Sequence, residues 1–345
     1  MPKARPEQSV FEFLTYPQVG GDDWAYMSQS AQVRTLEMQL LSRTVLMDMA
    51  NAPDFSAAVA SLAAGEYALP QGSARFEDVQ TVLLEKRANV RELFADWMLD
   101  AAVVALFKSR HDFANLRLAL RRTLTDRPFG ADYSEEGNMP PELIEHVLEE
   151  ENYDLFPPYM RRATEQAVLG YYQNKDIRQI DYAIDQVEAD HKLAEAARIE
   201  SVFLLNLFRI QVDLTNIRTM LRLRFADAQH RQGLLAGGFV ELERFRQGLE
   251  LGSEALGQLF FATPYHRIVD AGVAYLTSSQ SFLKVEQLCD EYLIGFLRST
   301  GQVTAGPQVI VAYLLMKEHE IRTVRLILTA KKNLLDTKLI LDRVA

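Results

Sequence analysis

The chain has 345 residues, of which 48% are hydrophobic and 24% charged, and its formal net charge is −10. This composition is ordinary for a soluble, well-cored protein. Duplex binding needs a broad basic face, so the acidic balance predicts no nucleic-acid partner. The single cysteine, Cys289, excludes an intrachain disulfide and a zinc site built on paired cysteines.

No apolar run approaches the ~20 residues of a membrane-spanning helix, so we expect no such segment. Residues 1–21 lack the apolar core of a signal peptide and are predicted to form an N-terminal extension of a chain in a reducing compartment.

Helical signals then follow one another to the end of the chain. A helix is predicted from Ser30, Asp54 is placed to cap the next one, and a long helical region starts at Phe76. Pro141 suits a helix start, and further helices are predicted over 176–194, 196–224 and 334–344. Because no stretch alternates with period two, the sequence predicts an all-α fold without a sheet.

One helical motif recurs three times, with an acid, then an amide or hydroxyl, then arginines at fixed offsets. Its acids are 101 and 107 residues apart, which indicates three tandem units. Gly137 and Gly238 each lie 22 residues after the motif asparagine. We predict an extension over 1–21 and helical units over 22–137, 138–238 and 239–345. The copies are Asp112, Asn115, Arg117 and Arg121; Asp213, Asn216, Arg218 and Arg222; and Glu320, Thr323 and Arg325.

These helices are basic elements of an acidic protein. The segments 108–127, 209–231 and 317–332 contain six, five and five basic residues, each against two acids. The arginines are therefore expected either to face a partner or to pair with acids of a neighbouring unit. The acids and amides of the three copies are expected to make hydrogen bonds at an interface or to satisfy backbone groups at a helix junction. The residues alone leave these alternatives open.

A metalloenzyme is a weaker alternative. Glu188 and His191 form an E-x-x-H pair, and Asp227 and His230 a D-x-x-H pair. A carboxylate-bridged dimetal bundle needs two E-x-x-H helices and two more glutamates, and only one such helix is present. The sequence also lacks a phosphate-binding G-x-x-x-x-G-K-[ST] loop. We therefore expect no catalytic residue, no metal and no cofactor.

The motif set resembles the C subunit of A/V-type rotary ATPases, whose counterpart in the vacuolar enzyme is the d subunit. The resemblance rests on the motif over 213–222, on its copies over 115–117 and 320–325, on the helix over 31–41 and on the loop over 235–238. It covers the chain from about Asp22 to the C-terminus.

The resemblance implies a non-catalytic central-stalk subunit, built as a funnel-like socket from three helical units. Its implied partners are the shaft subunits of D and F type and the proteolipid rotor ring, on the cytoplasmic face of the membrane, in a motor that moves protons or sodium ions. The third copy departs from the pattern, with Thr323 for the amide and no glycine after its helix, so Asn333 is expected as the left-handed cap. The alternative is a free-standing helical-repeat scaffold with another partner.

Overall fold

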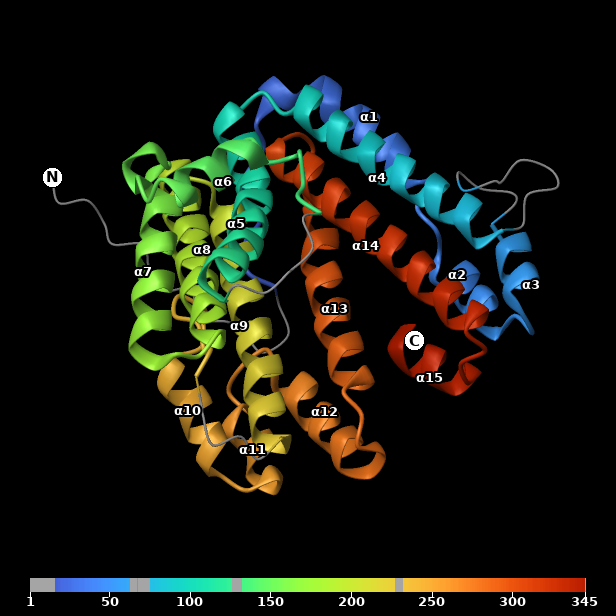
Figure 1. Ribbon diagram of the computed structural model, residues 1–345. Helices are drawn as coiled ribbons and strands as arrows, with labels where there is room; N and C mark the ends of the chain where they lie inside the picture. The colour runs from blue at the N-terminus through green and yellow to red at the C-terminus, as the bar shows by residue number, and fades with distance from the viewer. Residues whose placement is uncertain (1–15, 63–66, 68–74, 126–131, 227–231, 345) are drawn as a thin grey trace, which may run out of the picture. The chain divides into compact units, whose positions relative to one another are not determined.

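The computed structural model describes residues 16–62, 67, 75–125, 132–226 and 232–344. Within these ranges it contains fifteen α-helices and three 3₁₀ helices and no strand, which confirms the all-α prediction. Figure 1 shows the order of these helices. None of the described helices is long and apolar enough to cross a membrane. The chain divides into two compact units, Met1–Leu99 with Gly252–Ala345, and Asp100–Leu251.

The first unit joins the N-terminal and C-terminal parts of the chain around α14 (Pro307–Lys332), which runs alongside α4 (Phe76–Trp97) (Figure 1). Val324, Ile327 and Leu328 of α14 are fully buried, and they share one core with residues of α2 (Arg43–Asn51), α3 (Phe55–Ala60) and α4. The elements of this unit are η1 (Trp24–Tyr26), α1 (Met27–Glu37), α2 (Arg43–Asn51), α3 (Phe55–Ala60), α4 (Phe76–Trp97), α11 (Ser253–Leu259), α12 (His266–Ser279), α13 (Leu283–Arg298), η3 (Ser299–Gln302), α14 (Pro307–Lys332) and α15 (Thr337–Val344).

The second unit is a bundle in which α7 (Pro158–Asn174) and α8 (Arg178–Arg198) pack along each other and α5 (Ala101–Thr125) packs against both. Its core contains Leu116 of α5, Ile144 of α6, Met160 of α7 and Ile184 of α8, all fully buried. The elements of this unit are α5 (Ala101–Thr125), α6 (Pro141–Glu149), η2 (Tyr153–Leu155), α7 (Pro158–Asn174), α8 (Arg178–Arg198), α9 (Val202–Phe225) and α10 (Leu242–Glu250).

Local signals place several helix ends. The Asp54 carboxylate accepts the amide of Ala57 at 2.8 Å and caps α3, as predicted, and Pro141 stands at the start of α6. The prediction that one helix begins at Ala196 was wrong. Glu200 is left-handed with φ +58°, so α8 ends before it and Ser201 caps a new helix, α9.

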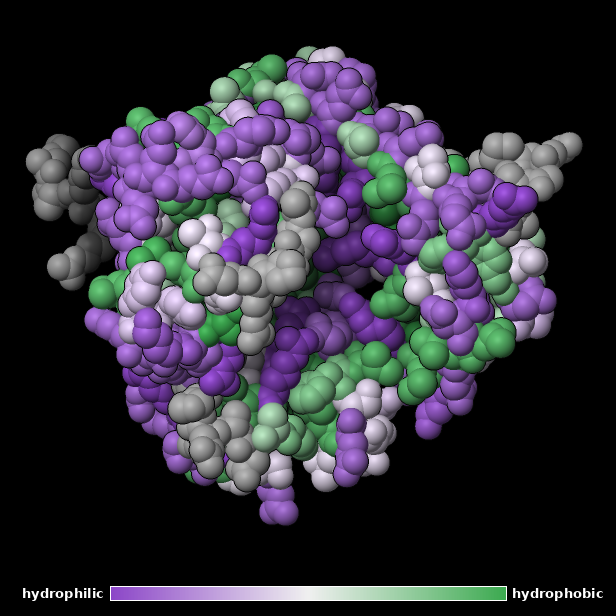
Figure 2. Space-filling model, viewed as in Figure 1, coloured by the Kyte–Doolittle hydropathy of each residue, from purple (hydrophilic) through white to green (hydrophobic). Residues whose placement is uncertain are grey.

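The prediction for the end of the last motif helix was also wrong. Asn333 has φ −88°, whereas the left-handed residue is Leu334 with φ +54°. Backbone bonds close the turn, from Leu334 to the carbonyl of Lys331 at 3.1 Å and from Leu335 to that of Ala330 at 3.0 Å. The Asn333 side chain adds a bond to the carbonyl of Thr329 at 2.9 Å. Leu334, Leu335 and Leu339 are exposed, and apolar residues gather on the face seen in Figure 2 around α15.

Candidate functional site

The three motif copies lie on α5, α9 and α14, and their acids are almost completely buried. Asp112 and Asp213 have 0% of their surface exposed, and Glu320 has 5%. A buried carboxylate is costly unless hydrogen bonds satisfy it, so the partners of these three acids define the site.

On α5, Asp112 binds the segment that leads into α6. Its carboxylate accepts the amide of Met139 at 3.0 Å, the side-chain amide of Asn138 at 2.8 Å and the Tyr159 hydroxyl at 2.7 Å. One turn along the helix, Asn115 pairs twice with the backbone of Ser134, donating at 2.8 Å and accepting at 2.9 Å. Side chains of one helix therefore hold the backbone of a loop at two points.

On α9, the same arrangement holds the segment that leads into α10. Asp213 accepts the amides of Phe239 at 2.9 Å and Val240 at 3.2 Å. Asn216 pairs twice with the backbone of Leu235, donating at 2.8 Å and accepting at 2.7 Å. We call each such acid, with the loop backbone that it binds, a clamp.

The clamps explain the spacing between motif and glycine. A Cβ atom on Gly137 would lie 2.4 Å from Oδ1 of Asp112, and one on Gly238 would lie 2.0 Å from Oδ1 of Asp213. Each loop approaches its buried carboxylate so closely that a side chain has no room at this point. The glycine is thus required by contact with the acid, since neither glycine has a positive φ.

On α14, Glu320 makes a third clamp with different partners. It accepts the backbone amide of Leu41, the Tyr67 hydroxyl at 2.6 Å and the Lys317 ammonium at 2.7 Å. The Lys317 ammonium also lies 4.7 Å from the centre of the Tyr67 ring, so the ion pair is enclosed. Thr323 stands at the amide position but bonds to its own helix, donating to the His319 carbonyl at 3.0 Å.

Two of the predicted arginines pair with acids of α8. Arg117 contacts Asp185 at 2.6 Å and Asp181 at 3.5 Å, and Arg121 contacts Asp181 at 2.5 Å. Burial lowers the pKa of Arg117, but Asp185 and Asp181 outweigh it, so the net pKa is raised. These contacts join the first motif helix to a helix of the predicted second unit.

The other predicted arginines lie at the surface of their helices. Arg218 is half-buried, whereas Arg222 on α9 and Arg325 on α14 are exposed. These arginines are therefore less buried than the acids of the same motif.

The residues of the metal alternative have other contacts. Glu188 accepts the Lys192 ammonium at 2.5 Å, and the His191 ring stacks on Tyr159 at 4.3 Å. Burial lowers the pKa of His191, which favours the neutral ring. In the described ranges no three His, Cys, Asp or Glu side chains gather as a metal site would need. Asp227 and His230 lie outside the described residues.

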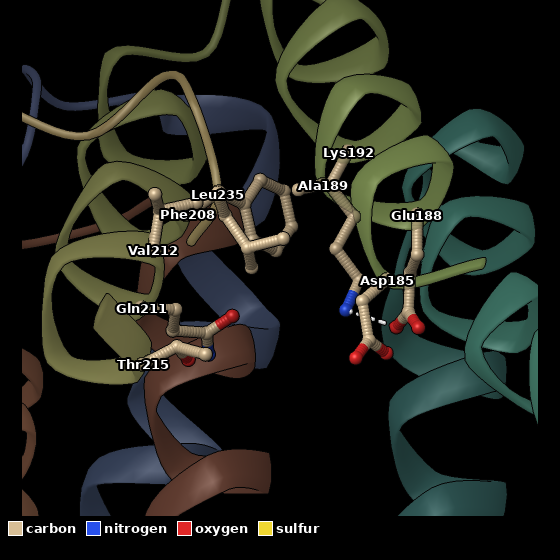
Figure 3. A pocket seen from close by; sticks show the side chains of 9 residues that line it. All are labelled: Asp185, Glu188, Ala189, Lys192, Phe208, Gln211, Val212, Thr215 and Leu235. Atoms are coloured by element: carbon tan, nitrogen blue, oxygen red, sulfur yellow. Dashed lines mark hydrogen bonds and ion pairs between the residues drawn. The ribbon is translucent and has the colours of Figure 1, made fainter. Parts of the chain in front are cut away.

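A pocket of about 200 Å³ lies between α8 and α9, beside the second clamp. Figure 3 shows Phe208, Val212 and Leu235 on one side of it and the Lys192–Glu188 pair with Asp185 on the other. Leu235 is the residue whose backbone Asn216 holds, so Asn216 also positions one wall of the pocket.

A second pocket, of about 340 Å³, adjoins the clamp on α14. His319 lines it, and burial lowers its pKa to about 4, with Asp290 opposing the shift and Arg322, Arg343 and Arg298 adding to it. The ring is therefore neutral near pH 7. The sequence showed no ligand spacing for this histidine and gave Lys317 no site role, although Lys317 stands three residues before Glu320 on the same helical face.

Two comparisons with known proteins match most of the chain. A family model described as ATP synthase (C/AC39) subunit matches residues 29–343, a range that contains all three motif helices. The C subunit of the V-type sodium ATPase of Enterococcus hirae is 21% identical over 268 residues, which cover 74% of this chain and 79% of that protein.

Proposed function

Because the chain belongs to the ATP synthase (C/AC39) subunit family, we propose that it joins the shaft to the membrane rotor ring of an A/V-type rotary ATPase. The family is that of the V-type ATPase C subunit, a non-catalytic structural part of the rotary complex, which agrees with the resemblance found in the sequence. In the proposed role the chain binds the D-type and F-type shaft subunits and the proteolipid ring at the cytoplasmic face of the membrane. The motor transports protons or sodium ions.

The observation that carries the proposal is the recurrence of one clamp on three motif helices within a chain of this family. Transmission of torque needs no chemistry, but it needs joints that do not slip under load. A buried carboxylate that binds backbone amides is such a joint, because breaking it leaves an unsatisfied charge in the core. We propose accordingly that the predicted units 22–137, 138–238 and 239–345 are the parts joined, and that they form the socket.

Arg218, Arg222 and Arg325 are proposed to face the partners. Arg222 is exposed on α9, Arg218 lies one turn before it and is half-buried, and Arg325 is exposed at the position on α14 that corresponds to Arg218. Arg117 and Arg121 are proposed instead to hold one unit to the next through α8. The motif would then combine inter-unit attachment with partner recognition.

Charge reversal tests this division of roles. The double variant R218E/R222E is expected to weaken binding of the chain to the shaft subunits or the ring in native mass measurements, while its far-UV circular dichroism stays that of the parent. R161E/R162E is the matched control, because it makes the same charge change at exposed positions of α7 in the same unit. Unchanged assembly of R218E/R222E, or equal weakening by the control, would refute the assignment of these arginines.

A further inference from the structure

The third clamp binds a segment that precedes its acid in the sequence, whereas the other two clamps bind segments that follow their acids. Asp112 and Asp213 each accept the amide of a residue 27 positions later, Met139 and Val240. Glu320 accepts the amide of Leu41, which lies 279 positions earlier.

We infer that Leu41 is the structural equivalent of Met139 and Val240, so that the last motif helix closes onto the start of the first repeat. The elements that follow the three residues agree with this. In each case a helix of nine residues begins two positions later: α2 after Leu41, α6 after Met139 and α10 after Val240. Short helices, α3, η2 and α11, then begin 14, 14 and 13 positions after the clamped residue.

The burial of these nine-residue helices follows one pattern. Their seventh and eighth residues are buried in all three: Met49 and Ala50, Val147 and Leu148, Gly248 and Leu249. Each helix also packs against the motif helix that holds its start, α6 against α5, α10 against α9 and α2 against α14. Position, length, burial and packing partner therefore recur together, which a chance contact between Glu320 and Leu41 does not explain.

The third joint differs from the first two in its covalent connection. The chain runs directly from α5 to α6 and from α9 to α10, whereas α14 and α2 belong to opposite parts of the sequence. Hydrogen bonds between residues 21–41 and 300–320 hold this joint, which we call the seam. Besides the clamp, they include Arg34 to the carbonyls of Thr300 and Val303 at 2.7 and 2.8 Å, and the amide of Thr304 to Asp22 at 2.7 Å.

The chemistry of the seam fits a joint that closes without a connecting loop. The position two residues before Leu41 is Gln39, where the other loops have glycine, and the acid is Glu, one methylene longer than Asp. A longer side chain reaches a backbone that stands further from the helix. The second contact point also differs, because Thr323 bonds to its own helix where the asparagines hold a loop, and the pocket of about 340 Å³ opens beside it.

Of the three described clamps, the one at the seam is accordingly the one whose two sides separate when the noncovalent contacts fail. We call Glu320, which holds the two sides together, the latch. One consequence rests on the proposed function: the three units of the socket open and close at the seam. The seam itself is a property of the isolated chain.

Hydrogen exchange of the isolated chain tests the latch, using E320D and E320A with D213A as the matched variant. E320D keeps the charge beside Lys317 but shortens the reach to Leu41. Both Glu320 variants are expected to exchange about tenfold faster throughout peptides of 22–51, since the lost bond is to a charged acceptor. D213A is expected to change only the peptides around 233–240, because the covalent connection keeps α10 in place.

Two results would overturn the inference. One is wild-type protection of 22–51 in E320D and E320A, which would mean that Glu320 holds nothing closed. The other is uniformly faster exchange over Met1–Leu99 and Gly252–Ala345, which would make Glu320 an ordinary core residue. Neither measurement includes a shaft or ring subunit, so a failure here is distinct from a failure of the proposed function.

Discussion

Gly238→Ala tests most sharply whether the loop before α10 is held against Asp213. The added Cβ would lie 2.0 Å from Oδ1 and 2.7 Å from Cγ of Asp213, far inside van der Waals contact. Asp213 is fully buried, so it cannot move aside into solvent. The loop must therefore retreat, and the bonds from Phe239 and Val240 to the carboxylate lengthen or break.

The magnitude follows from those two bonds. A hydrogen bond to a charged group contributes about 1.5–3 kcal/mol, and overpacking a core typically costs about 1–3 kcal/mol. Partial relaxation of the loop reduces both losses, so we expect the free energy of unfolding to fall by about 2–4 kcal/mol. Gly137→Ala is expected to behave alike, because its Cβ would lie 2.4 Å from Asp112.

The assay is urea unfolding followed by circular dichroism, with hydrogen exchange at the Phe239 and Val240 amides as the local readout. Gly170→Ala is the control, since its Cβ meets Gln179 at an ordinary 3.4 Å inside α7. Alanine is the better helix former, so the control is expected to gain about 0.5–1 kcal/mol. A Gly238→Ala protein as stable as the parent, with both amides still protected, would refute the clamp.

Three further predictions concern Asn216, the Arg117–Asp185 pair and His319. Asn216→Ala removes both bonds to Leu235 and should lower the free energy of unfolding by about 1–3 kcal/mol, with faster exchange of the Leu235 amide; unchanged exchange would contradict the pairing. A double-mutant cycle of Arg117 and Asp185 should give a coupling free energy of only about 0.5–1 kcal/mol, because the Asp185 side chain is 44% exposed. Zero coupling at low salt would show that this ion pair does not stabilise the fold. His319 has a pKa of about 4 in the folded state and is protonated more readily in the unfolded chain. Lowering the pH from about 6.5 to 4 is therefore expected to reduce the free energy of unfolding by as much as about 3 kcal/mol. An NMR titration midpoint of about 6 to 7 for this ring, its ordinary range, would contradict its burial.

The sequence identified the residues that form the local parts of the clamps, but left their bonding partners open. The acid, the amide and the later glycine lie within one stretch, and their equal spacing in two copies records a close contact between helix and loop. The helical fold followed from the absence of period-two alternation, and the C/AC39 resemblance from the motif set.

What the sequence did not reveal depends on backbone groups and distant segments. Leu41 contributes its amide to Glu320, so its side chain carries no signal of the contact. Asp181 and Asp185 form no recognisable motif, and only the packing of α5 on α8 brings them to Arg117. Asn333 was predicted as the left-handed residue after α14 because asparagine often adopts this conformation, but the next residue, Leu334, adopts it.

Affinity capture of the tagged chain from mildly solubilised native membranes tests the central claim most directly, with every co-purifying protein identified. The account predicts recovery of the D-type and F-type shaft subunits together with the proteolipid ring, and release of the chain by R218E/R222E but not by R161E/R162E. Recovery of the chain alone, at low salt and from intact membranes, would contradict the stalk role and favour a scaffold that serves another partner.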